Sequence, residues 1–167
     1  SHHSGDIMVL SAAIRALDGG INFFDVSDHH SLGVSERLLG QAFKGRRREV
    51  LITSKAGFHY TPLVTAALRV RFALKPVSRL LKPFKRPLHY FRAREGRYDF
   101  SEPHLMASVE ASLRRLQTDY IDLFQLYKPA APMLERGDFL PTLEKLKRQG
   151  KIRYYGIACQ TVEQGLV

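Results

Sequence analysis

Four short apolar segments alternate with amphipathic helical segments along this chain, and this alternation limits the fold more than any other feature. Each apolar segment is rich in β-branched and aromatic residues at consecutive positions; the four cover residues 21–27, 49–55, 120–127 and 152–159. Continuous apolar runs are typical of strands buried on both faces, as in a parallel sheet covered by helices. The sequence therefore predicts an α/β fold, either an open doubly wound sheet or part of a (β/α)8 barrel.

The helical segments carry recognisable start and stop signals. Residues 101–116 have apolar side chains at a spacing of three and four, and Ser101 precedes them as the expected N-cap. We also expect Ser35 to cap a helix that continues to residue 43. Ser35 and Glu36 together then form this helix start, with cofactor contact near the mouth of the site as a lesser alternative. Two further helices, each followed closely by glycine, are expected at residues 7–17 and 139–148.

Composition and common motifs exclude several classes of protein. The 167 residues are 44% hydrophobic, which is enough for one domain with a core, and no apolar run reaches the roughly 20 residues of a membrane span. The first residues are polar and Cys159 is the single cysteine, so we expect a cytoplasmic protein without a secretory signal. Neither G-x-G-x-x-G nor G-x-x-x-x-G-K-[ST] occurs, so Rossmann and P-loop nucleotide sites have no support.

One segment carries nearly all of the net charge of +10. Residues 66–97 contain ten lysines and arginines against a single acid, Glu95, inside a basic insertion at residues 61–98. We expect a loop that covers the substrate. The alternative is a surface for membranes or anionic partners, although three prolines break any long amphipathic helix. Nucleic-acid binding is not expected, because no recognised module accompanies the charge.

Polar side chains follow the predicted strands where each one ends. In parallel α/β folds the functional residues gather at these carboxyl ends. The first strand ends in Asp25 and is followed by Asp28, His29 and His30; the later strands end at Lys55, at Tyr127 with Lys128, and at Ala158, Cys159 and Gln160. A carboxylate, a lysine and proton-transferring side chains at one rim indicate acid–base chemistry on a polar substrate.

Several motifs together resemble the aldo/keto reductase family. The segment "GGINFFDVSDHHSLGVSERLLGQAF" resembles the family's "G-(I/V)-N-(F/H)-(F/I)-D-T-(A/S)" signature with its "S-E-x-x-(L/I)-G" continuation. The segments "VLITSKAG", "SVEASLRRLQTDYIDLFQLYKP" and "GKIRYYGIA" resemble the next motifs in the family's order. The resemblance implies strands two to five of a (β/α)8 barrel that binds NADP(H) and reduces carbonyl groups, or oxidises alcohols, of small molecules without a metal.

The resemblance also implies a catalytic tetrad of aspartate, tyrosine, lysine and histidine. Asp25 and Lys55 match two of these positions, whereas His30 stands in place of the tyrosine and Tyr127 in place of the histidine. We expect these four residues to be catalytic. The cofactor-binding residues implied by the resemblance are Asp25, Lys55, Ala158, Cys159 and Gln160. Asp122 resembles a family residue inside its strand, and we expect it to make a structural hydrogen bond.

The altered tetrad leaves several readings open. Hydride transfer to a carbonyl leaves an alkoxide that must be protonated, and a carboxylate such as Asp25 keeps Lys55 charged and oriented. The proton donor is either His30, whose charged form a nearby Lys55 disfavours, or Tyr127 from the opposite rim. The other readings are a degenerate site that binds without catalysing, and altered chemistry such as a lyase or isomerase step. No metal is expected at His29 and His30, because adjacent residues point apart.

The chain is shorter than a whole (β/α)8 barrel requires. A (β/α)8 barrel takes about 250 residues, and half of one has two open sheet edges and an exposed apolar interior. We therefore expect residues 1–167 to form a partial barrel domain, either a piece of a longer protein or a half-barrel that pairs with another chain. In the family, much of the phosphate and adenine site lies on later strands, so this chain alone is expected to bind NADP(H) poorly. Its oligomeric state is left open.

Overall fold

The computed structural model describes residues 2–28, 30–61, 65–66 and 96–166. Residues 1, 29, 62–64, 67–95 and 167 are not described, so His29 and most of the basic insertion lie outside the described residues. The expectations for that insertion therefore stay predictions.

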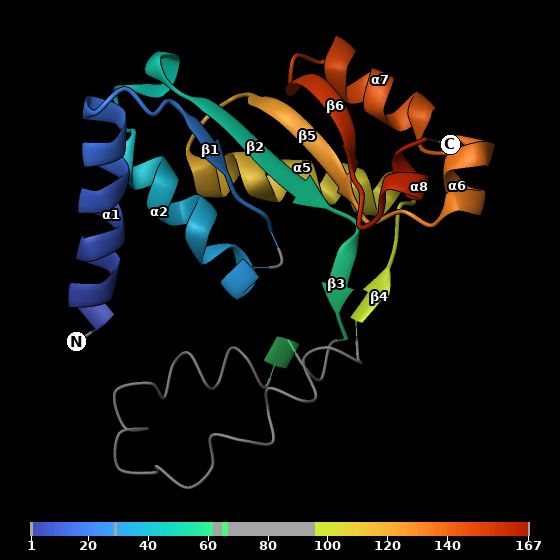
Figure 1. Ribbon diagram of the computed structural model, residues 1–167, viewed down its shortest axis with the longest axis horizontal. Coiled ribbons are helices and arrows are strands. Elements are labelled where there is room, and N and C mark those ends of the chain that lie inside the picture. Colours follow the sequence, from blue (N-terminus) through green and yellow to red (C-terminus); the bar gives the residue numbers. More distant parts are fainter. Residues whose placement is uncertain (1, 29, 62–64, 67–95, 167) are drawn as a thin grey trace, which may run out of the picture.

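A four-stranded parallel sheet forms the centre of the fold (Figure 1). Its strands are β1 (Phe23–Asp25), β2 (Leu51–Ala56), β5 (Ile121–Tyr127) and β6 (Ile152–Ala158), in that spatial order. Every neighbouring pair is parallel, and β1 and β6 form the two edges. The predicted α/β fold with a parallel sheet is confirmed, and each of the four predicted strands forms in its expected segment, with β2 ending one residue later, at Ala56.

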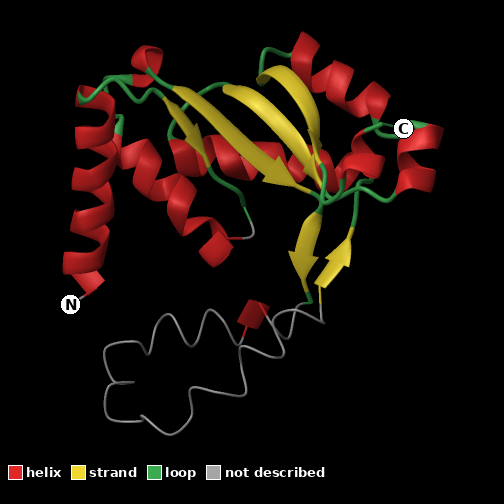
Figure 2. Cartoon of the chain, viewed as in Figure 1, coloured by secondary structure: helices red, strands yellow, loops and turns green. Residues whose placement is uncertain are grey.

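A second, antiparallel pair of strands was not predicted. β3 (Phe58–Tyr60) pairs with β4 (Gly96–Tyr98), and both extend away from the carboxyl end of the main sheet (Figure 2). Aromatic rings hold the pair, with Phe58 and Tyr98 centroids 5.3 Å apart. Each strand has three residues, which is too short for a two-residue periodicity to be visible in the sequence.

Six helices accompany the strands in the described part of the chain. They are α1 (His2–Asp18), α2 (Val34–Ala42), α5 (Glu102–Leu116), α6 (Ala131–Arg136), α7 (Leu140–Arg148) and α8 (Val162–Gly165). Two short 3-10 segments, η1 (His30–Gly33) and η2 (Arg47–Glu49), precede α2 and β2. None of these helices combines the length and apolar character that a membrane crossing requires.

The predicted cap at Ser35 is wrong, whereas the one at Ser101 is right in position. Gly33 occupies the N-cap of α2 with φ 77°, because η1 runs directly into the helix and the chain must turn in the left-handed region. Ser35 therefore lies inside the first turn. Ser101 is the N-cap of α5, and its backbone N–H donates to Asp99 Oδ1 at 2.9 Å.

Among the described residues, helices cover one face of the parallel sheet and leave the other open. The covered face carries buried side chains such as Ile52, Phe124 and Leu126, which pack with Leu105 and Val109 of α5. In Figure 1, α5 crosses behind the strands. Several side chains on the opposite face are exposed, such as Phe23 at 51% and Tyr154 at 67%, whereas Thr53 and Ile121 on that face are buried. The open face has the position of a barrel interior.

Candidate active site

The strand register places most of the expected site residues on the open face. Asp25 is in register with Thr53, two residues before Lys55, and Lys55 is in register with Gln125, two residues before Tyr127. Tyr127 is in turn in register with Ala158. Since side chains alternate along a strand, these residues point to the same side, near the carboxyl ends of their strands.

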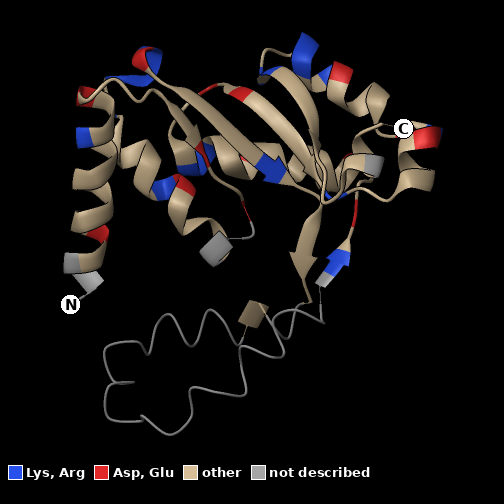
Figure 3. Cartoon of the chain, viewed as in Figure 1, with Lys and Arg blue, Asp and Glu red and all other residues tan. Residues whose placement is uncertain are grey.

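Asp25 and Lys55 form the ion pair expected from the sequence. The Lys55 ammonium group donates to Asp25 Oδ1, and it lies 3.5 Å from the backbone oxygen of Val26. Figure 3 colours lysine and arginine blue, and β2 has one blue segment. Lys55 is the one charged residue of Leu51–Ala56. The Lys55 side chain is 14% exposed and that of Asp25 is 57% exposed. A mostly buried ammonium group is thus held beside a carboxylate that faces the open side.

Tyr127 ends β5 at the same rim. The backbone N–H of Lys128 donates to the Ala158 oxygen at 3.0 Å, which ties the ends of β5 and β6 together. Lys128 has φ 54°, and its ammonium nitrogen lies 5.1 Å from the centre of the Tyr127 ring. A left-handed backbone at a residue other than glycine is strained, and such strain gathers at functional sites.

Gln125 is a site residue that the sequence analysis missed. It is the register partner of Lys55, it is half-buried, and its side-chain Nε2 donates to the Ile157 oxygen at 3.5 Å. The sequence does carry a signal for it, because Gln125 is a polar residue two positions before Tyr127. A spacing of two places both on one face.

The structure places His30 only by its backbone. His30 begins η1, the 3-10 segment between β1 and α2. Nothing is described of its side chain, so its catalytic role stays a prediction.

The residues after β6 lie at a cavity on the rim. Ala158 ends the strand, and Cys159 and Gln160 follow it with exposed side chains. A cavity of about 510 Å³ opens here, between the loops that follow β4, β5 and β6, and its lining includes Tyr98, Lys128 and Gln160. Asp99 also lines it, and hydrogen bonds from Ser101 hold the pKa of this carboxyl below its usual range. The exposed Gln160 and Tyr98 and the half-buried Lys128 thus line a space large enough for a small molecule.

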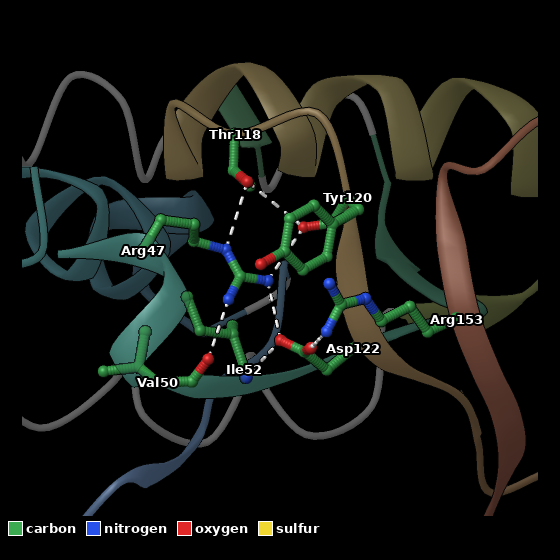
Figure 4. A network of polar contacts seen from close by, with 7 residues as sticks. All are labelled: Arg47, Val50, Ile52, Thr118, Tyr120, Asp122 and Arg153. Carbon is green, nitrogen blue, oxygen red and sulfur yellow. Dashed lines mark hydrogen bonds and ion pairs between the residues drawn. The ribbon is translucent and has the colours of Figure 1, made fainter. Parts of the chain in front are cut away.

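Asp122 makes the structural contacts expected of it, on the covered face (Figure 4). Its Oδ2 accepts from the Ile52 backbone N–H at 3.0 Å and from Arg47 at 2.6 Å, and its Oδ1 accepts from Arg153 at 2.9 Å. Both guanidinium groups stack on the Tyr120 ring, at 4.0 and 3.9 Å from its centre. Asp122 is the second residue of β5, at the opposite end of the strand from Tyr127.

Glu36 does not reach the mouth of the site. Its side chain is completely buried and contacts Ser54 and Arg115. The cofactor contact considered for it in the sequence analysis is therefore wrong.

Comparison with known proteins places the chain in a family. Residues 8–165 match the aldo/keto reductase family. An uncharacterised oxidoreductase of Bacillus subtilis, YqkF, is 30% identical over 152 residues, covering 89% of this chain and 39% of that protein. L-galactose dehydrogenase of Arabidopsis thaliana is 29% identical over 143 residues, covering 83% of this chain and 34% of its own length.

Solved structures give the same result. Aldo-keto reductase AKR11C1 from Bacillus halodurans superposes with a TM-score of 0.69 at 28% identity, covering 93% of this chain and 42% of that one. An aldo/keto reductase from Klebsiella pneumoniae in complex with NADP and acetate has a TM-score of 0.64 at 26% identity, covering 97% and 43%. The chain thus spans less than half the length of each. Because the family match covers residues 8–165 and the solved structures share its fold, the chain belongs to the aldo/keto reductase family.

Proposed function

We propose that this protein is an NADP(H)-dependent oxidoreductase that reduces the carbonyl group of a small molecule and oxidises the corresponding alcohol. The observation that carries this proposal is the Asp25–Lys55 ion pair, which lies on the same face as Tyr127. The related reductase from Klebsiella pneumoniae, which is in complex with NADP and acetate, supports the choice of cofactor.

The residues at the rim fit a nicotinamide group chemically. The exposed side chain of Gln160 has both a donor and an acceptor, which matches the carboxamide of a nicotinamide. The small side chain of Ala158 is in register with Tyr127 on the neighbouring strand. Gln160 also lines the cavity of about 510 Å³, although Asp25, Lys55 and Tyr127 do not. When bound, the cofactor supplies a hydride to the carbonyl carbon.

In this mechanism the charged residues act on the oxygen of the substrate. The Lys55 ammonium group stabilises the negative charge that develops on the carbonyl oxygen. Asp25 holds that ammonium group in place through their ion pair. Tyr127 donates the proton that converts the alkoxide to an alcohol, and His30 is the second candidate for this step.

The exchanged residues at positions 30 and 127 favour one alternative function. A family member that lacks the usual tyrosine and histidine in their places could bind the cofactor as a binding or regulatory protein, without turnover. The two functions differ in one observable, which is the consumption of reduced cofactor.

The deciding experiment uses the full-length protein with NADPH and a panel of aliphatic, aromatic and sugar aldehydes. NADPH consumption is followed by absorbance, and NADPH binding is measured separately by fluorescence. Turnover of at least one aldehyde supports the proposed reductase. Measurable NADPH binding without turnover of any aldehyde supports the binding protein instead, and absence of both contradicts the cofactor assignment.

A further inference from the structure

Glu36 is a completely buried carboxylate that the proposed chemistry does not use. It lies in α2, where it accepts from the hydroxyl of Ser54 in β2 at 2.7 Å and from Nε of Arg115 in α5 at 2.5 Å. Arg115 also donates to Ser112 Oγ at 3.1 Å. One carboxylate therefore joins a helix, a strand and a second helix, and both of its oxygens have partners.

The same arginine supports a strained turn just before α2. Leu32 and Gly33 both have left-handed backbone conformations, with φ 55° and 77°. A Cβ on Gly33 would lie 2.4 Å from Nε of Arg115, so the guanidinium group occupies the space that any larger residue needs. A strained turn persists only when its surroundings hold it in place, and here the Glu36–Arg115 pair does so.

The network reaches both segments that carry proposed catalytic residues. Ser54 immediately precedes Lys55 in β2, and its side chain points to the covered face while that of Lys55 points to the open face. The strained turn ends η1, the segment that begins with His30. Through Arg115, Glu36 thus connects the strand that carries Lys55 to η1, which begins with His30.

Stability alone does not explain such a network. Apolar side chains of similar volume usually stabilise a protein as well as a buried ion pair does, because the charges lose their hydration. An ion pair with two further hydrogen bonds instead fixes one geometry. We infer that Glu36, with Arg115 and Ser54, is a positioning residue that fixes the segment at residues 30–33 relative to Lys55. The effect of this positioning on catalysis rests on the proposed function.

The test replaces the pair by apolar side chains of similar length, in the double variant Glu36→Met/Arg115→Met. We expect a melting temperature close to that of the wild type, but amide hydrogen exchange at residues 31–33 that is on the order of tenfold faster. We expect kcat for the best aldehyde to fall on the order of 100-fold, with a much smaller change in KM, since misplacement of reacting groups acts on the chemical step.

A matched control removes another ion pair of α5. Lys151 donates to Glu110, and the pair is partly exposed and lies away from the turn. The variant Glu110→Gln/Lys151→Met should leave both kcat and exchange at residues 31–33 as in the wild type.

The outcomes separate this inference from the proposed function. Faster exchange confined to the turn, together with lower kcat, supports the inference. Unchanged exchange, or unchanged kcat with faster exchange, overturns it. If the wild type has no turnover, the proposed function fails, and exchange alone then decides whether Glu36 holds the turn.

Discussion

The ammonium group of Lys55 on β2 contacts the carboxylate of Asp25 on β1, across neighbouring parallel strands and on the face of the sheet that the helices leave open. The pair is asymmetric, because the lysine is mostly buried and the carboxylate is largely exposed. The contact with Asp25 fixes the direction of this ammonium group. This relationship is the basis of the function that we propose.

The proton donor can be identified by two substitutions. Tyr127→Phe removes the phenolic proton while it keeps the ring at the end of β5, so we expect kcat to fall by about 100-fold if Tyr127 is the donor. His30→Gln should then lower kcat by less than about fivefold. Steady-state kinetics with one aldehyde measure both variants. The reverse pattern, with a large loss only for His30→Gln, would assign the proton to the histidine.

Asp122 is predicted to matter for stability and not for turnover. Asp122→Ala leaves the mostly buried guanidinium group of Arg47 without its partner, and also removes an acceptor from the Ile52 backbone N–H. We expect a loss of about 3 kcal/mol in the free energy of unfolding, measured by urea denaturation. The control is Asp138→Ala, which breaks the exposed pair with Arg136 and should cost less than about 1 kcal/mol. Equal losses for the two variants would contradict the structural role of Asp122.

Asp99 is predicted to add an acid-dependent part to the stability. Hydrogen bonds from Ser101 lower the pKa of Asp99 in the folded protein, so its contribution is complete above the ordinary aspartate range. That contribution is lost as the pH falls below about 4 and through the lowered folded-state value. Between pH 6 and pH 3 the melting temperature of the wild type should therefore fall by about 2 °C more than that of Asp99→Asn. Glu49 and Glu110 also have lowered pKa values, but they are unchanged in both proteins and cancel. Parallel curves of melting temperature against pH for the wild type and Asp99→Asn would contradict the prediction.

The strands were predictable because their signal is local. The segments before Lys55 and Tyr127 contain several consecutive apolar residues, and the sheet places both of these residues at the carboxyl ends of their strands. The Asp25–Lys55 pair followed from the same reasoning, since neighbouring parallel strands bring their carboxyl ends together. Helix 101–116 was predicted from its apolar spacing for similar reasons.

Other features depend on contacts between distant parts of the chain. The N-cap of α2 is Gly33 and not Ser35, because η1 runs directly into the helix; Arg115 from α5 occupies the space that a side chain at position 33 would need. Glu36 looks like an ordinary residue of a first helical turn, and only the approach of Ser54 and Arg115 shows that it is buried. The β3–β4 pair joins two three-residue segments whose preference for each other no local pattern indicates.

The most direct test of the central claim is the turnover of Lys55→Met in the full-length protein. We expect kcat with NADPH and the best aldehyde to fall by about 100-fold or more, because the developing charge on the carbonyl oxygen loses its cation. Lys145→Met, which removes an exposed lysine from its pair with Glu102 at 2.8 Å, should leave kcat unchanged. Wild-type turnover in Lys55→Met would contradict the account.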